Sequence, residues 1–189
     1  MIKENFNVPN ILSMFRLLLV PVYWFVFFNV SVWWGMGVFL LAFFTDMLDG
    51  YIARKYNLIT PLGKLLDPLA DKIMQMSAML SVVIAGALHY VFAILIIVKE
   101  VFMILGGAYM LKKKIVVFSN FFGKFATCAM TVGFFVIFLS LGFLESGMSA
   151  AGLVNLIGTI LMILAVSSSY LAGIVYFRDS LKKLRELKQ

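Results

Sequence analysis

Four aspartates, arranged in two pairs, are the residues of this chain whose type and spacing could do chemistry. Asp46 and Asp49 are three residues apart, and Asp67 and Asp71 are four residues apart. On a helix, residues three or four apart project from the same face, about one turn from each other. Each pair is therefore expected to present two carboxylates on one side of its own helix.

Four carboxylates gathered at one site would need cations among them. Two unit negative charges about 4 Å apart repel by about 4 kcal/mol at an effective dielectric constant near 20. An all-oxygen ligand set favours Mg²⁺, Mn²⁺ or Ca²⁺ over Zn²⁺, and Mg²⁺ commonly shares protein carboxylates with substrate phosphates. The alternative interpretation is that the acids pair with Arg54, Lys64 and Lys72 as charges that hold helices together.

The rest of the chain has the composition of a membrane protein. Its 189 residues are 63% hydrophobic and 13% charged, and the mean hydropathy is +1.03. A soluble domain carries about 25% charged residues, and a disordered chain far fewer apolar ones, so both classes are excluded. Ionisable side chains at membrane depth are costly and usually functional, which favours a site over structural pairing. The single cysteine, Cys128, excludes an intrachain disulfide and a cysteine-rich zinc cluster.

Six apolar segments are long enough to cross a bilayer, at about 20 residues per span. We expect an all-α, integral membrane bundle of six transmembrane helices that forms a single domain over residues 1–189. The two acidic pairs fall at the end of one helix and the start of the next, so they should converge at similar depth. The expected segments are residues 11–31, 34–55, 64–87, 90–111, 121–143 and 150–177.

The distribution of Lys and Arg predicts the orientation of this bundle. These residues collect at both chain ends and in the second and fourth connections, whereas the other three connections hold only His89 and Glu145. Cytoplasmic loops are enriched in Lys and Arg, so both termini and the acidic pairs are expected to face the cytoplasm. The basic run at 178–188 suits anionic lipid headgroups. The net charge of +7 therefore indicates a membrane surface and no nucleic-acid partner.

The acidic pairs belong to a longer pattern of eight residues with fixed gaps. The chain reads Asp46-x2-Asp49-Gly50-x2-Ala53-Arg54-x8-Gly63-x3-Asp67-x3-Asp71. This string resembles, at every defining position, the signature of the CDP-alcohol phosphatidyltransferases. The chain length and the predicted number of spans extend the resemblance beyond the 26 residues of the motif.

The resemblance implies a reaction and a role for each acid. Members of this family displace CMP from a CDP-linked lipid by attack of an alcohol hydroxyl, with two divalent ions, Mg²⁺ or Mn²⁺. By this resemblance Asp46, Asp49 and Asp67 are metal ligands. Asp71 also faces the metals and is the candidate general base. Paired metals can clamp the attacking and leaving oxygens of a phosphoryl transfer, so these roles agree with the chemistry expected of the residues.

The resemblance also implies substrate-binding residues. Gly50, Ala53 and Gly63 would line the pocket for cytidine and diphosphate, and Arg54 would face a phosphate. Lys124 stands in a stretch similar to the Gly-Lys-x-x-Thr that opens the fifth span in relatives, where it would bind an anionic acceptor or the lipid diphosphate. The alternative for Lys124 is a side chain that simply extends to the membrane surface.

The start of the chain indicates to which branch of the family the chain is most similar. Pro9-Asn10-x-Leu12-Ser13-x-x-Arg16 resembles the opening shared by bacterial enzymes that make phosphatidylglycerophosphate and cardiolipin. We expect Asn10 to cap the first helix and Arg16 to meet a phosphate. The expected substrates are CDP-diacylglycerol and glycerol 3-phosphate, with phosphatidylglycerol, which would give cardiolipin, as the alternative acceptor. A location in the cell membrane follows, and a homodimer is implied by the family alone.

A divalent-cation transporter is the competing class of protein. Such a protein could also use four aspartates as an ion site, but its polar residues should continue along a path to the far face. In this sequence the ionisable residues gather toward one side, and the outer halves of the segments are apolar. The pattern therefore favours the enzyme.

Overall fold

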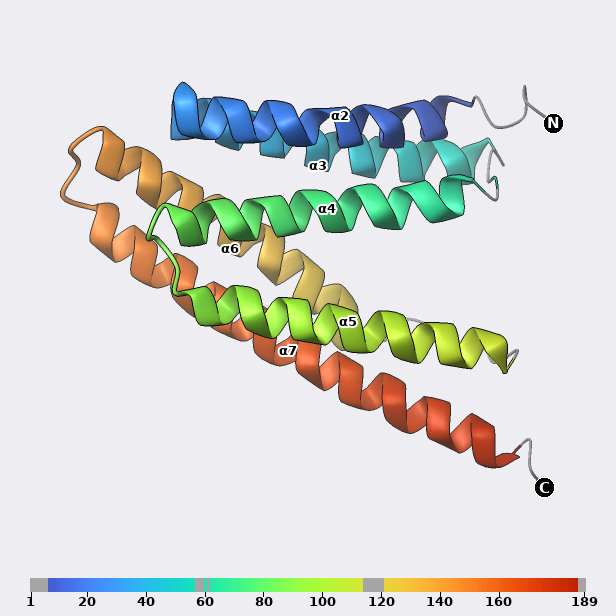
Figure 1. The fold of residues 1–189 in the computed structure, drawn as a ribbon. Coiled ribbons are helices and arrows are strands. Elements are labelled where there is room, and N and C mark those ends of the chain that lie inside the picture. Colours follow the sequence, from blue (N-terminus) through green and yellow to red (C-terminus); the bar gives the residue numbers. More distant parts are fainter. Residues whose placement is uncertain (1–6, 57–59, 61, 114–120, 187–189) are drawn as a thin grey trace. The chain divides into compact units, whose positions relative to one another are not determined.

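The computed structural model describes residues 7–56, 60, 62–113 and 121–186, and these residues form helices and no strand. The all-α prediction is confirmed. The described helices, drawn in Figure 1, are α2 (Val8–Asn29), α3 (Val32–Lys55), α4 (Gly63–Ile84), α5 (Tyr90–Lys112), α6 (Phe121–Glu145) and α7 (Ala151–Glu186).

Five of these helices are long and apolar enough to cross a membrane. They are α2, α6, and the stretches Val32–Ala53 of α3, Tyr90–Gly107 of α5 and Ala151–Lys182 of α7. The chain is therefore an integral membrane protein. The exception is α4, which we expected to be a sixth span. Its first half carries the second acidic pair together with lysines, and this concentration of charge distinguishes it from the other five helices.

The chain forms two compact units. The first contains residues up to Ala85 together with Leu141–Ser149, and the second contains Gly86–Ser140 and the chain from Ala150 onward. In the first unit α2 packs against both α3 and α4, and α2 and α3 lie side by side in Figure 1. Both acid-bearing helices therefore share α2 as a neighbour.

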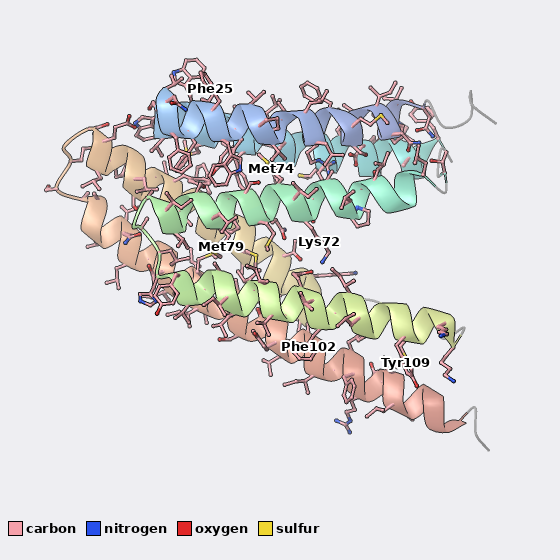
Figure 2. All side chains as sticks on the ribbon, viewed as in Figure 1. Phe25, Lys72, Met74, Met79, Phe102 and Tyr109 are labelled. Atoms are coloured by element: carbon pink, nitrogen blue, oxygen red, sulfur yellow. The ribbon has the colours of Figure 1, made fainter. Side chains whose placement is uncertain are left out.

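The buried face of α2 changes character along the helix. Its N-terminal half buries the polar side chains of Asn10, Ser13 and Arg16. Its C-terminal half buries Leu19, Tyr23 and Phe27. Successive members of this row are three or four residues apart, which places them on one helical face. Figure 2 shows Met74 of α4 on the side of that helix that faces α2, whereas Phe25 projects from α2 away from α4. The row thus gives α2 a polar end and an apolar end.

Side chains cap the first two helices. The side chain of Asn7 accepts a hydrogen bond from the backbone N–H of Asn10 at 3.1 Å, so Asn7 is the N-cap of α2. Our expectation that Asn10 would cap this helix was wrong, because the helix begins three residues earlier and Asn10 lies in its first turn. At the start of α3, Ser31 is the N-cap. Its hydroxyl and the N–H of Val32 donate to Glu145, at 3.0 and 3.2 Å.

The second unit is held by close helix contacts. The hydroxyl of Tyr170 on α7 donates to the backbone carbonyl of Leu95 on α5 at 2.8 Å. Between α6 and α7, a Cβ added to Gly158 would lie 2.6 Å from the side chain of Ile137. Small residues of this kind let membrane helices approach closely.

Candidate active site

The acidic pair of α3 is bridged by a buried arginine of α2. Arg16 is 1% exposed, and its Nη1 lies 2.6 Å from Oδ1 of Asp46. Its Nη2 donates a hydrogen bond to Oδ2 of Asp49. The side chain of Asp49 is buried, whereas that of Asp46 is 40% exposed. The guanidinium therefore joins one carboxylate that is removed from solvent and one that remains accessible.

A second residue of α2, Ser13, links the acids of the two helices. Its side chain is fully buried, and its hydroxyl hydrogen-bonds Oδ1 of Asp67 on α4. The hydroxyl oxygen of Ser13 also lies 3.5 Å from Oδ2 of Asp49 on α3 and 3.0 Å from the carbonyl oxygen of Pro9. A hydroxyl has a single hydrogen to donate, so Ser13 can donate to only one of these three acceptors at a time. Ser13 thus places one carboxylate of each pair around a common atom.

The connection between α3 and α4 is attached to α2 through Asn10. The Nδ2 of Asn10 donates to the hydroxyl of Thr60 at 2.9 Å, and that hydroxyl accepts from the backbone N–H of Gly63 at 3.0 Å. A Cβ added to Gly63 would lie 2.5 Å from Oδ1 of Asn10. Gly63, predicted to line the nucleotide pocket, therefore also has a packing role at the start of α4.

The remaining predicted site residues are placed as follows. Asp71 is half-buried on α4, one turn beyond Asp67, and Gly50 and Ala53 are half-buried on α3. The backbone of Arg54 is helical, but its side chain lies outside what the structure describes. Lys124 lies on α6 and is exposed. Their roles in substrate binding and catalysis stay predictions.

Contacts of Ser13 and Arg16 with the acids were not predicted from the sequence. Arg16 was expected to bind a phosphate, and Ser13 was given no role. A sequence signal for them exists. Asn10, Ser13 and Arg16 recur every three residues within an otherwise apolar helix, and a polar row in a membrane helix normally faces protein or a cavity.

The four carboxylates suit divalent ions in chemistry. A set of oxygen ligands with a formal charge of −4 fits Mg²⁺ or Mn²⁺. The four aspartates lie on α3 and α4, which both pack against α2. Their arrangement differs from a ready metal site: among the residues that the structure describes, no three His, Cys, Asp or Glu side chains converge closely enough to hold one ion. Two of the acids instead contact Arg16.

Comparison with known proteins shows to which family this chain with its four aspartates belongs. Residues 6–171 match the family model described as CDP-alcohol phosphatidyltransferase. The chain belongs to this family. The resemblance seen in the motif is therefore confirmed, and the transporter alternative is set aside in favour of a phospholipid-synthesising transferase.

Curated relatives point to one branch of the family. The chain is 30% identical over 178 residues to a CDP-diacylglycerol–glycerol-3-phosphate 3-phosphatidyltransferase from Aquifex aeolicus, covering 93% of this chain and 95% of the relative. A Rickettsia bellii protein of the same name is 31% identical over 181 residues, covering 93% and 96%. One from Bacillus subtilis is 32% identical over 143 residues, covering 67% and 74%.

Proposed function

We propose that this protein transfers a phosphatidyl group from CDP-diacylglycerol to a hydroxyl of glycerol 3-phosphate, forming phosphatidylglycerophosphate and CMP. The observation that carries the proposal is the complete eight-residue signature, borne by two helices that pack on the same third helix. The choice of glycerol 3-phosphate over phosphatidylglycerol is supported by the relatives, which are named for glycerol 3-phosphate.

The four aspartates have the central role in this proposal. Asp46, Asp49, Asp67 and Asp71 would hold two divalent ions, Mg²⁺ or Mn²⁺. When bound, these ions supply positive charge that offsets the charge of the diphosphate and its leaving group. Asp71 is also proposed to accept the proton of the attacking hydroxyl. Ser13 supports this assignment, because its bond to Asp67 and its proximity to Asp49 hold acids of both helices near one point.

Substrate contacts are assigned to the smaller and basic residues. Gly50, Ala53 and Gly63 would line the cytidine and diphosphate pocket, since their lack of bulk leaves room beside the acids. Arg54 and Lys124 would bind anionic groups of the donor lipid or the acceptor. CDP-diacylglycerol suits such a site, because its acyl chains stay in the bilayer while its nucleotide reaches the interface.

The membrane placement that we propose includes α4 as a sixth span. With six spans, both termini lie on one side, and the basic residues at the ends and in two connections favour the cytoplasmic side of the cell membrane. The acids then lie near the cytoplasmic boundary, where a soluble acceptor such as glycerol 3-phosphate can reach them. By family resemblance the protein would act as a homodimer.

The reaction is tested with the purified full-length protein, CDP-diacylglycerol, Mg²⁺ and a panel of acceptors. We expect CMP release with glycerol 3-phosphate and a lipid product with the mass of phosphatidylglycerophosphate. Cardiolipin formed from phosphatidylglycerol, with no product from glycerol 3-phosphate, would move the chain to the alternative branch. Turnover that persists in excess EDTA would contradict the metal-assisted mechanism.

Asp71→Asn tests the proposed base. Because a positioned base contributes about 10²–10⁴-fold to rate, turnover should fall at least about 100-fold while binding of CDP-diacylglycerol is retained in part. Asp179→Asn removes an exposed carboxylate of α7 and should leave turnover near that of the wild type. Equal rates for the Asp71→Asn variant and the wild type would remove Asp71 from the mechanism.

A further inference from the structure

Arg16 is the buried cation that the two acids of α3 contact in this structure. Its side chain is 1% exposed, and it pairs with Asp46 and Asp49 through its two terminal nitrogens. A buried charge is tolerated only when it is paired. The guanidinium therefore offsets one of the two negative charges of these carboxylates, and the proposed metal ligands are in contact with a cation of the protein itself.

The hydrogen bonding of Arg16 is incomplete. Its Nε, although buried, has no hydrogen-bond partner in the described part of the chain, and its Nη1 approaches Asp46 without hydrogen-bond geometry. A guanidinium has five N–H donors in a fixed fork. Arg16 is thus held by charge attraction and by its hydrogen bond to Asp49, whereas a guanidinium whose donors are all bonded would be held more firmly.

We propose that Arg16 is a built-in counter-ion that competes with divalent cations for Asp46 and Asp49, so that the positive charge of its guanidinium weakens metal binding at these carboxylates. The proposal rests on the proposed function, which makes both acids metal ligands. Arg16 contacts Oδ1 of Asp46 and Oδ2 of Asp49, so a metal ion that binds these carboxylates meets the positive charge of the guanidinium a few ångströms away. Arg16 therefore raises the cation concentration at which the site fills, and below that concentration it offsets part of the negative charge of the two acids.

The competition predicts the effect of removing the positive charge. Arg16→Gln keeps a long polar side chain but removes the cation, so Mn²⁺ should bind at least about tenfold more tightly than to the wild type. This expectation is conservative for the loss of a unit charge a few ångströms away at an effective dielectric constant near 20. Without added metal the same variant should have a lower Tm, because two neighbouring carboxylates lose their counter-ion. Mn²⁺ should raise its Tm by more than it raises that of the wild type.

The experiment measures Mn²⁺ binding to the full-length protein in detergent, by electron paramagnetic resonance of the free ion and with no lipid substrate present. Arg16→Lys is the second variant, because a lysine keeps the charge but cannot bridge two carboxylates as a planar fork does. Its Mn²⁺ affinity should fall between those of the wild type and Arg16→Gln. If Arg16→Gln does not fold, a Lys variant that binds Mn²⁺ more tightly than the wild type still supports the proposal.

The matched control is Lys112→Gln, which removes an exposed positive charge at the end of α5. It should bind Mn²⁺ with wild-type affinity. Weaker binding by the Arg16 variants would show that Arg16 positions the acids for the metal and would overturn the proposal. Unchanged affinity in both Arg16 variants would also overturn it, as would an equal gain in the Lys112 control.

The binding measurement separates this inference from the proposed function. If wild-type protein releases no CMP with any acceptor but its Mn²⁺ affinity rises on Arg16→Gln substitution, the proposed reaction fails and the counter-ion role stands. If wild-type protein releases CMP and the affinity does not rise, only the counter-ion role fails.

Discussion

At the scale of single residues, Gly63 shows how closely the parts of the site are packed. It begins α4, its N–H donates to Thr60, and the side chain of Asn10 stands where a Cβ of residue 63 would be. Asn10 is itself buried and holds Thr60. A larger residue at position 63 must therefore displace a hydrogen-bonded side chain, four residues before Asp67.

Gly63→Ala is expected to destabilise the protein by about 1–3 kcal/mol, the usual range for overpacking a filled site, and to lower activity because the start of α4 shifts. The measurement is the free energy of unfolding in mixed detergent micelles. Gly37→Ala is the control on α3, where an added Cβ meets nothing within 4 Å. That substitution should be neutral or stabilising by up to about 1 kcal/mol. Equal losses at both positions would contradict the packing role of Gly63.

At the scale of elements, the contact of α2 with α4 includes a buried hydrogen bond far from the acids in sequence. The hydroxyl of Tyr23 bonds that of Ser81, which itself donates to the carbonyl of Ala78 at 2.9 Å. Tyr23 and Ser81 are both fully buried. This polar contact and the Ser13–Asp67 bond join α4 to α2 at two positions along the helix. Both contacts are important because the first half of α4 carries acids and lysines, which gives it less apolar surface for packing.

A double-mutant cycle with Tyr23→Phe and Ser81→Ala should give a coupling free energy of about 0.6 kcal/mol, the typical value for hydrogen bonds between membrane helices. The unfolding free energies of the two single variants, the double variant and the wild type provide this value. As a control, Tyr23→Phe combined with Ser140→Ala should be additive, since the hydroxyl of Ser140 donates to Ile137 within α6. A coupling near zero for Tyr23 and Ser81 would show that this bond does not stabilise the pairing of α2 with α4.

At the scale of the whole molecule, the membrane topology depends on α4. Five described helices qualify as spans by length and composition, and α4 does not. The six spans that we propose would put both basic ends of the chain on the cytoplasmic side, in agreement with the positive charge of the second and fourth connections. If α4 did not cross, the second connection, before α4, and the fourth, after α5, would lie on opposite sides of the membrane, so these two basic connections could not both follow this rule.

Cysteine labelling in intact cells tests whether α4 crosses. In a Cys128→Ser parent, Lys55→Cys and His89→Cys place single thiols at exposed positions before and after α4. A membrane-impermeant maleimide should label His89→Cys at once and Lys55→Cys only after permeabilisation. Ser149→Cys, in the connection between α6 and α7, should behave like His89→Cys. Labelling of Lys55→Cys and His89→Cys from the same side would exclude α4 as a span.

Much of the fold could be predicted because membrane helices are locally specified. A span needs about 20 apolar residues and satisfies its backbone hydrogen bonds within itself. Expected segments such as 34–55 and 90–111 therefore agree with α3 (Val32–Lys55) and α5 (Tyr90–Lys112) to within two residues. The acidic motif was equally visible, since its residues keep fixed gaps on two consecutive helices.

The sequence by itself determined the class of protein, the helices and the four acids, because each of these depends on neighbours along the chain. Only the tertiary structure decided what the acids contact. Arg16 lies 33 residues from Asp49, and Ser13 lies 54 residues from Asp67, and such pairings depend on which helix faces meet. Polar groups removed from water must find partners among the side chains that packing brings near, so the contacts of α2 with the acids emerge only once the helices are assembled.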